Sequence, residues 1–529
     1  MDMLIKASLL FLFFAVMVVI GFACRRHARN VDGFVLGGRS VGPWLTAFAY
    51  GTSYFSAVVF VGYAGQFGWR YGISATWVGI GNALIGSLLA WAVLGRRTRI
   101  MTQHLDSATM PDFFAKRFGS PALKLMAAAI IFVFLIPYTA SLYNGLSRLF
   151  GMAFSIDYTW CVVLMSVLTA IYVIAGGYMA TAINDFIQGI IMLVGLVVVI
   201  WAVLESKGGL LVALDGLARI EGPSVLPGGS PTPGIFTSFF GPEPLNLLFV
   251  VILTSLGTWG LPQMVQKFYA IKNEGSIKKG TIISTLFAFV VAGGCYYLGG
   301  FGRLFSGVLN VTAKGVPADG FDAIIPKMLE GLPSMLIALV VVLVLSASMS
   351  TLSSLVITSS STFTIDFLNG TVVKKMSDKK QVLCIRVLIV VFIAISAILA
   401  LVQYKSTSPI AFIAQMMGVS WGAMAGAFLA PFLYSLYTKK VTAASCWACF
   451  ILAPAFTLVG VFCRDAMPGI LKSPINTGAL AMLGGLVIVP IVNLFTRKPP
   501  KDLVDGAFAC YEKTTVVQQA TALGAETIR

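Results

Sequence analysis

The stretch LSASMSTLSSLVITSSSTFTIDF, from Leu345 to Phe367, decides how the rest of the chain is interpreted. More than half of its residues are serine or threonine, although the run just before it is strongly apolar. On a helix that turns about 100° per residue, side chains at i, i+3, i+4 and i+7 spacing share one face. One such face carries Ala347, Ser350, Thr351, Ser354, Thr358 and Ser361. The stretch therefore predicts an oxygen-rich helix face without a full charge.

Two interpretations of this face are open from the stretch alone. Small alkali cations take several oxygen ligands from hydroxyls and carbonyls, which this face and a broken neighbouring helix could supply without a buried carboxylate. Alternatively, serine and threonine allow membrane helices to pack closely and hydrogen-bond back to their own carbonyls. Other parts of the chain have to distinguish a cation site from a packing surface.

The composition excludes a soluble domain. Of 529 residues, 58% are hydrophobic and 11% are charged, and the mean hydropathy is +0.89. About thirteen apolar runs are long enough, at roughly 20 residues, to cross the hydrocarbon core of a bilayer. The first run, Met3 to Cys24, ends in CRRHAR without a clear small-residue cleavage site, so we interpret it as a retained helix. The runs start near Met3, Pro43, Gly72, Pro121, Asp157, Asn184, Leu245, Ser276, Leu332, Gln381, Ser408, Val441 and Thr477.

The formal charge of +16 reflects membrane orientation and not a nucleic-acid partner, because the cations fall in alternate loops. By the positive-inside rule these basic loops are cytoplasmic. That places the N-terminus outside and the C-terminus inside the plasma membrane, which in a bacterium is the inner membrane. The basic loops hold Arg25, Arg26, Arg29 and Arg39, then Arg96, Arg97, Arg99, Lys116 and Arg117, then Lys267, Lys272, Lys278 and Lys279, then Lys374, Lys375, Lys379 and Lys380, then Lys439 and Lys440, and finally Arg497, Lys498 and Lys501.

The chemistry-bearing residues do not favour a membrane enzyme. The eight cysteines are scattered, and the close pair Cys446 and Cys449 sits inside a predicted membrane helix, while the two histidines, His27 and His104, fall in basic loops. A metal or redox site needs more ligands than that, and no zinc-protease helix, phosphate loop or nucleophile elbow occurs. We therefore predict neither an enzyme nor a structural metal. A channel is an alternative at this point, because hydroxyls and carbonyls also line pores.

Two membrane segments are interrupted in the middle by glycine or proline. The first, Thr46 to Gly68, contains AYGTSYFSAVVFVGYAG, and the second, Ile252 to Gln266, contains TSLGTWGLPQ. Each begins a run of five predicted helices, and because five is odd the second run lies upside down relative to the first. Paired broken segments in inverted repeats indicate a secondary transporter with its binding site at the bilayer midplane. Glycine also serves simple helix packing, so either interruption alone would be weak evidence.

This organisation divides the all-helical chain into five parts. Two inverted five-helix repeats form the core, and the remaining helices are accessory. We expect an accessory helix at 1–24, the first repeat at 43–205, the second repeat at 245–437, two accessory helices at 441–496 and a cytoplasmic tail at 497–529.

An acidic residue, Asp185, opens an apolar helix in the stretch YVIAGGYMATAINDFIQGIIML. Asp185 with Gln188 three residues later fits a capping arrangement that satisfies free N–H groups at a helix start. Alternatively, Asp185 lies on an ion path, because ionisable groups at membrane depth are costly and usually serve transport. Both interpretations are open, and they do not exclude each other.

Several motifs together resemble those of the sodium:solute symporters, whose members carry proline, pantothenate, sugars, sialic acid and other small solutes. They are FVLGGRSVGPW at 34–44, MPDFFAKRFG at 110–119, the GG-x-x-A run that continues to Asp185 and Gln188, GLPQ at 260–263, and STLSS through TID at 350–366. The resemblance implies a leucine-transporter-like core of two inverted five-helix repeats, with about thirteen helices in all. It favours a cation site over a packing surface on the serine-rich face.

The resemblance also implies two sodium sites. The family's main site corresponds to the backbone carbonyls of Thr52, Phe55 and Ala347 and the hydroxyls of Ser350 and Thr351. A second site, which only some relatives have, corresponds to Asp185, Ser350, Ser353 and Ser354. Sodium is then the coupling ion, and no other cofactor is expected. For the solute we expect apolar and aromatic walls with a few polar groups between the two broken segments. The candidates are Tyr54, Ser56, Val59, Thr258, Trp259 and Gln263.

Departures from the family pattern bear on the solute. Tyr54 stands where sodium/proline symporters have an aspartate, and Ser354 where they have a cysteine, which speaks against proline. Val58 and Val59 replace polar pocket residues of the sugar carriers. The strings SYFS and INDFIQG look closer to sodium/pantothenate symporters, which favours a small carboxylate-bearing metabolite such as a pantothenate-like compound or a monocarboxylate. An amino acid such as proline is the other expected class of solute.

We therefore expect a plasma-membrane symporter that uses the sodium gradient to accumulate a small organic solute by alternating access. The alternatives are a channel and a transporter-like sensor that binds the solute without bulk transport. The segment from Arg497 to Arg529 holds no recognisable signalling domain, which speaks against the sensor.

Overall fold

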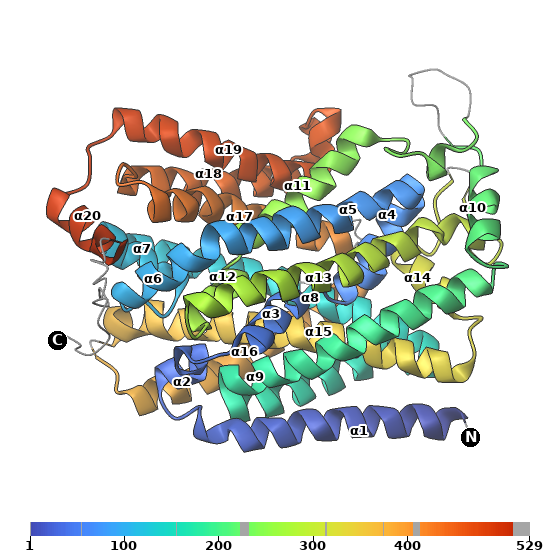
Figure 1. Ribbon diagram of the computed structural model, residues 1–529, viewed down its shortest axis with the longest axis horizontal. Coiled ribbons are helices and arrows are strands. Elements are labelled where there is room, and N and C mark those ends of the chain that lie inside the picture. The colour runs from blue at the N-terminus through green and yellow to red at the C-terminus, as the bar shows by residue number, and fades with distance from the viewer. Residues whose placement is uncertain are drawn as a thin grey trace, which may run out of the picture.

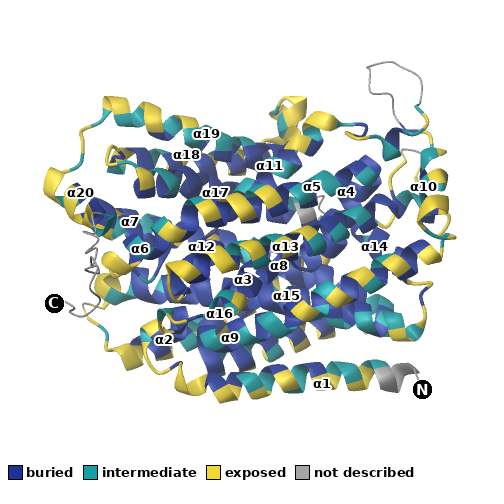
Figure 2. Ribbon diagram, viewed as in Figure 1, coloured by how far each residue is buried: buried dark blue, intermediate teal, exposed yellow. Residues whose placement is uncertain are grey.

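The computed structural model describes residues 2–53, 55–154, 156–222, 232–312, 315–373, 375–405 and 413–511. Within these ranges the chain is a bundle of long helices lying side by side, without strands beyond isolated bridges (Figure 1). The expected all-helical fold is confirmed. Buried residues fill the interior, and exposed residues lie on the outer helices (Figure 2). The exposed residues include large apolar side chains such as Phe11 and Leu494. Such outward faces suit lipid rather than water.

Ten described helical stretches are long and apolar enough to cross a membrane, or eleven when the bent pair α11 and α12 counts as one span. The long stretches are α1 (Asp2–Ala23), Val58–His104, α8 (Pro121–Phe154), α9 (Tyr158–Glu205), α13 (Glu274–Gly300), α15 (Ser334–Thr362) with its extension η10 (Phe363–Val372), α16 (Asp378–Lys405), α17 (Ile413–Tyr437), α18 (Ala443–Phe462) and α19 (Pro474–Phe495).

Short helices lie at the two ends of the bundle (Figure 1). One end carries α2, α6, α7 and α20, and we call it the basic end because many of the predicted basic loops fall there. The opposite end carries α10 and α14. Their bounds are α2 (Val31–Leu36), α6 (Arg96–His104), α7 (Met110–Phe118), α10 (Leu210–Ala218), α14 (Ile324–Leu329) and α20 (Lys501–Phe508).

Both predicted interruptions are present. The first separates α3 (Pro43–Thr52) from η3 (Val58–Tyr63), a wide π-type turn that continues into α4 (Ala64–Tyr71). The second separates α11 (Pro244–Gly260) from α12 (Pro262–Ala270), whose axes differ by 45°. Leu261 between them has an extended backbone with φ −78° and ψ 122°. Pro262 favours this conformation in the residue before it and has no N–H to continue the helix.

A third break divides α9, which is too long to cross a bilayer once. Gly177 has φ 56° and ψ −152°, a backbone conformation that only glycine adopts without strain. The chain therefore forms two arms, 158–176 and 178–205. A Cβ atom at Gly177 would also come within 2.9 Å of the carbonyl oxygen of Phe34 in α2. The predicted glycine pair thus marks a bend that packs α2 and α9 together.

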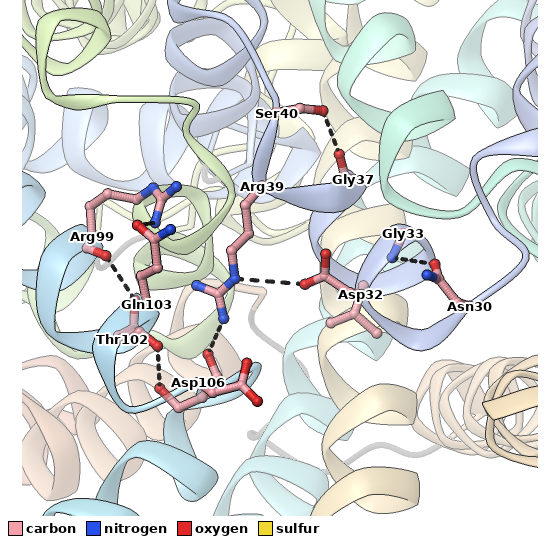
Figure 3. Close-up of polar contacts among 12 residues, drawn as sticks. Asn30, Asp32, Gly33, Gly37, Arg39, Ser40, Arg99, Thr102, Gln103 and Asp106 are labelled. Atoms are coloured by element: carbon pink, nitrogen blue, oxygen red, sulfur yellow. Dashed lines mark hydrogen bonds and ion pairs between the residues drawn. The ribbon is translucent and has the colours of Figure 1, made fainter. Parts of the chain in front are cut away.

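Arg39, in the loop before α3, joins segments that are distant in sequence (Figure 3). Its Nε lies 3.6 Å from an Asp32 carboxylate oxygen, and its Nη2 donates to the carbonyl oxygen of Ser107 at 2.7 Å. Arg39 has a left-handed backbone with φ 51°. Its side chain lies between α2 and the loop after α6. The base of the first broken helix is therefore fixed to the basic end.

Three cations that the sequence places in exposed loops are buried instead. The exposed fractions are 6% for Arg99, 0% for Arg117 and 1% for Lys267. Arg99 donates to backbone carbonyls of the segment after α12, and Arg117 to those at the end of α17. Lys267 lies inside α12, so its assignment to a loop was wrong. The charge pattern gave no indication of burial, because the positive-inside rule counts cations without regard to packing.

Candidate cation and solute site

The serine-rich helix α15 lies at the centre of the bundle. Every residue from Leu343 to Thr362 is buried, so the helix has no lipid-facing or water-facing side along this stretch. Polar groups buried in this way need partners inside the protein. The contacts of its hydroxyls therefore show what the oxygen-rich face is built to do.

The five groups of the expected main cation site come together. The hydroxyl oxygen of Ser350 lies 3.0 Å from the carbonyl oxygens of Thr52 and Ala347. The hydroxyl oxygen of Thr351 lies 3.1 Å from those of Thr52 and Ala347 and 3.4 Å from that of Phe55. The carbonyls of Thr52 and Phe55 face α15 because the first broken helix is interrupted there, which removes their usual helical partners.

These five oxygens form a cluster with more acceptors than donors. Each hydroxyl has one hydrogen, whereas each carbonyl oxygen has two lone pairs. The two hydroxyl hydrogens occupy at most two of the six lone pairs on the three carbonyl oxygens that lie within hydrogen-bonding distance. An oxygen cluster with this excess of lone pairs suits a small hard cation.

Further contacts hold the first broken helix against α15. The hydroxyl oxygens of Ser53 and Ser354 lie 2.9 Å apart, and the Ala57 N–H donates to the hydroxyl oxygen of Ser348 at 3.2 Å. Close packing supports the same region, since a Cβ atom at Gly51 would come within 2.3 Å of the Phe287 ring of α13. The cluster geometry is therefore fixed from both sides of the interruption.

The groups of the expected second site have a different environment. Ser353 donates to the carbonyl oxygen of Ser350 at 2.9 Å, and Ser354 accepts from the ammonium of Lys267 at 3.0 Å. The Asp185 carboxylate is fully buried, and neither of its oxygens has a hydrogen-bond partner among the described residues. Lys267 is also buried, and its charge is opposite to that of Asp185. Lys267 is thus a functional candidate that the sequence interpretation missed.

Capping by Asp185 is wrong. The backbone breaks at Gly177, so Asp185 lies about two turns inside the arm 178–205 and not at its start. Gln188 donates its side-chain N–H to the sulfur of Met17 in α1 at 3.3 Å, which is not a capping contact. The helix start was predicted too late in the sequence. A mostly apolar run does not show which glycine has the left-handed backbone that ends one helix and begins the next.

The expected solute residues fall into two groups. Ser56 and Val59 are buried beside the first interruption, while Tyr54 lies outside the described residues. Thr258 and Trp259 donate to the carbonyl oxygens of Gly86 and Ile85, both at 2.9 Å, so their polar atoms face η5 (Asn82–Leu89).

Gln263 differs from Thr258 and Trp259. Its exposed fraction is 0%, and both polar atoms of its amide are without a partner in the described part of the chain. A buried amide with no partner costs free energy in the absence of a ligand. Gln263 is therefore the side chain of the second interruption best suited to bind a solute.

A polar cavity of about 190 Å³ lies beside α4, α11 and the segment before α19. Its lining includes the cations Arg70, Arg464 and Lys472, together with the amide side chains of Gln66 and Asn246. The C-terminal end of α4 and the N-terminal end of α11 both contribute, so the cavity lies on the side of the interruptions away from the basic end. A vestibule of this composition attracts anionic groups.

The family model described as Sodium:solute symporter family matches residues 34–452. The chain belongs to the sodium:solute symporter family. It is therefore a sodium-coupled transporter of a small organic solute and not an enzyme. The resemblance of the sequence motifs is confirmed.

Relatives of this symporter match over nearly their whole length. The osmoregulated proline transporter OpuE of Bacillus subtilis is 28% identical over 93% of this chain and 94% of its own. The sodium/proline symporter 2 of Staphylococcus saprophyticus is 28% identical over 96% of this chain and 95% of its own.

Solved structures share the fold. One is described as the substrate-bound outward-open state of a Na+-coupled sialic acid symporter, with a TM-score of 0.71 and 16% identity over 94% of this chain and 99% of that chain. Another, MhsT in complex with L-phenylalanine, has a TM-score of 0.50 and 14% identity over 85% and 97%. At these identities the likeness concerns the fold alone.

The symporter also has a buried charge cluster at its basic end. Asp366 of η10 accepts from the hydroxyl of Thr109 at 2.7 Å and lies 3.3 Å from the ammonium of Lys124 in α8. Lys124 and Lys116 each lie 3.0 Å from the Asp112 carboxylate. The motifs around residues 110–119 and 364–366 therefore meet in space and tie η10 to α7 and α8. The sequence interpretation missed this pairing, because the partners are far apart along the chain.

Proposed function

We propose that this symporter imports its solute together with a sodium ion bound by Ser350 and Thr351 and by the carbonyl oxygens of Thr52, Phe55 and Ala347. The observation that carries the proposal is the convergence of these five oxygens at the first interruption. A cation there joins α15 to the first broken helix and offsets the excess of lone pairs. When the ion leaves, this attraction is lost and the two elements can separate, which couples sodium to alternating access.

The same proposal includes two inverted repeats, at 43–205 and 245–437, within about thirteen spans. At about 1.5 Å per residue, the stretches Val58–His104 and Tyr158–Glu205 are each about twice as long as a bilayer core is thick. Each contains a left-handed glycine, Gly72 with φ 63° and Gly177 with φ 56°. Division at these two glycines supports a count of about thirteen, with one broken helix opening each repeat.

For the orientation, we propose that the basic end faces the cytoplasm. In Figure 1 the basic end, where α20 lies, is opposite the end at which α1 starts, which supports an outer N-terminus and an inner C-terminus. The loops of the basic end hold most of the exposed cations, as the positive-inside rule requires. The cavity lined by Arg70, Arg464 and Lys472 then opens towards the outside, where solute enters.

For the solute, we propose a small molecule with a carboxylate, and proline is the first compound to test because relatives of this chain transport it. The names of the relatives support proline, while the cationic lining of the cavity supports a carboxylate group in general. Tyr54 and Ser354 differ from the proline-carrier pattern. Pantothenate-like compounds and monocarboxylates are therefore tested as solutes beside proline.

The test is uptake by the purified protein in proteoliposomes, with radiolabelled proline, pantothenate and lactate. An inward sodium gradient should drive accumulation of one of them, and an equal potassium gradient should not. Collapse of the gradient by a sodium ionophore should release the accumulated solute. Solute binding without accumulation would indicate a sensor, and ion current without solute accumulation would indicate a channel. Either outcome would contradict the proposal.

A further inference from the structure

Lys267 is a buried lysine that the proposed transport mechanism does not use. It lies in α12, four residues after Gln263, and only 1% of it is exposed. Its ammonium donates to Ser354 on α15 at 3.0 Å and lies 5.0 Å from the centre of the Tyr178 ring. A lysine at membrane depth is costly, so it marks a functional position and needs an anion that compensates its charge.

Asp185 supplies the compensating charge. Its carboxylate oxygens are buried without a hydrogen-bond partner in the described residues. The Lys267 ammonium lies over the ring of Tyr178, which shares a face of the arm 178–205 with Asp185, seven residues later. Each charge on its own would be far from water in a medium of low dielectric constant. Their charges are opposite, so the two buried groups of α9 and α12 carry no net charge, and the ammonium contacts Ser354 of α15.

The serine-rich face is therefore divided into two halves. Ser350 and Thr351 contact backbone carbonyls of the first interruption, an environment that is rich in lone pairs and without a formal charge. Ser354, one turn later, contacts the hydroxyl of Ser53 and the ammonium of Lys267. A sodium ion between Asp185 and Ser354 would lie close to the ammonium, and two like charges repel strongly in such a medium.

We propose that the ammonium of Lys267 is a tethered cation that takes the place of a second sodium beside Asp185, Ser353 and Ser354, so that one sodium is transported per solute. The inference rests on the proposed function, because it concerns how many ions that function uses. It replaces the second sodium site expected from the sequence. The ammonium remains with the protein through the cycle, so it contributes structure at this position without consuming the sodium gradient.

The test measures stoichiometry in two ways, by binding of radioactive sodium to purified protein and by the charge moved per solute in proteoliposomes. The wild-type protein should bind one sodium, with a Hill coefficient for sodium near one. Lys267→Met leaves the Asp185 carboxylate without a counter-charge, so a second sodium should bind and the Hill coefficient should rise towards about two. The charge moved per solute should rise by one.

Two further variants control for loss of packing. Lys267→Arg keeps the cation and should keep a single bound sodium. The double variant Lys267→Met/Asp185→Asn has neither charge and should return to one sodium, because the carboxylate that attracts the second ion is gone. If Lys267→Met is too unstable to assay in low sodium, its thermal stability should increase with sodium concentration more steeply than that of the wild type.

Two bound sodium ions in the wild type would overturn the inference while leaving sodium-coupled transport intact. A folded Lys267→Met variant that still binds one sodium, with an unchanged Hill coefficient, would overturn it as well. Failure of the proposed function itself would look different, because the wild type would then accumulate no solute in response to sodium.

Discussion

Thr351 and Thr52 are 299 residues apart in the sequence, and the hydroxyl oxygen of the first lies 3.1 Å from the carbonyl oxygen of the second. This contact links the middle of α15 to the end of α3. It forms only because the first broken helix is interrupted after Thr52, which leaves that carbonyl without its usual helical partner. In the proposed site, sodium affinity and the packing of these two helices therefore depend on the same few oxygens.

Removal of either hydroxyl from the main cation site should weaken sodium binding. Ser350→Ala and Thr351→Ala each remove one of the five oxygens, so the sodium concentration for half-maximal uptake should rise at least tenfold, equivalent to about 1.4 kcal/mol. Ser361→Ala is the matched control, because Ser361 shares the face but donates to Thr358 of its own helix at 3.2 Å. The measurement is uptake as a function of sodium concentration. Equal titration curves for all three variants would show that Ser350 and Thr351 do not bind the sodium ion.

The buried pair Asp366 and Lys124 should stabilise the basic end. A double-mutant cycle with Asp366→Asn and Lys124→Met should give a coupling energy of about 1–3 kcal/mol, because Asp366 is fully buried and Lys124 is partly buried. The exposed pair Lys327 and Glu330, 2.8 Å apart, is the control and should couple by about 0.5 kcal/mol or less. Unfolding monitored by thermal shift in detergent gives both values, and equal coupling at the two pairs would show that burial adds nothing.

The meeting of the Ser350 and Thr351 hydroxyls with the carbonyls of the first interruption could be predicted, because each of the two segments has a specific local pattern. Pro262 marks the second break, and the hydroxyl spacing around Ser350 indicates the helix face that meets the first. Gly51 and Gly257 lie inside α3 and α11, where they pack against Phe287 and Trp421, so they indicated the interrupted segments but not the breaks themselves. The motif resemblance supplied the pairing between these segments.

Burial of single charges could not be predicted. Lys267 follows QMVQ and precedes a basic loop, so its sequence neighbours do not distinguish a buried ammonium from an exposed one. Asp185 was placed at a helix start because the left-handed backbone of Gly177 is a property of the folded chain. The roles of Thr258 and Trp259 also depend on a third element, η5, whose carbonyl oxygens accept from both side chains.

The orientation of the bundle is testable with a native cysteine. Cys463 is exposed at the end of α18, and in a variant without the other cysteines it should react with an impermeant maleimide from outside intact cells. Ser377→Cys, at an exposed position before α16, should react only after the membrane is permeabilised. Labelling of both from the same side would contradict the proposed topology, because an odd number of spans separates the two positions in it.

Gln263 should bind the solute, and its amide should lower the stability of the solute-free protein. Its buried amide has no partner in the described residues, so Gln263→Leu should leave the solute-free protein as stable as the wild type or more stable. The same change should raise the KM for the solute about tenfold or more, equivalent to about 1.4 kcal/mol, and leave the sodium titration close to the wild-type curve. Trp259→Phe is the control, because it removes the N–H that donates to Ile85 and should lower stability more than solute affinity. Thermal shift without solute, combined with uptake kinetics, separates the two effects. If Gln263→Leu destabilises the solute-free protein and leaves the KM unchanged, the amide serves the fold and the solute binds elsewhere.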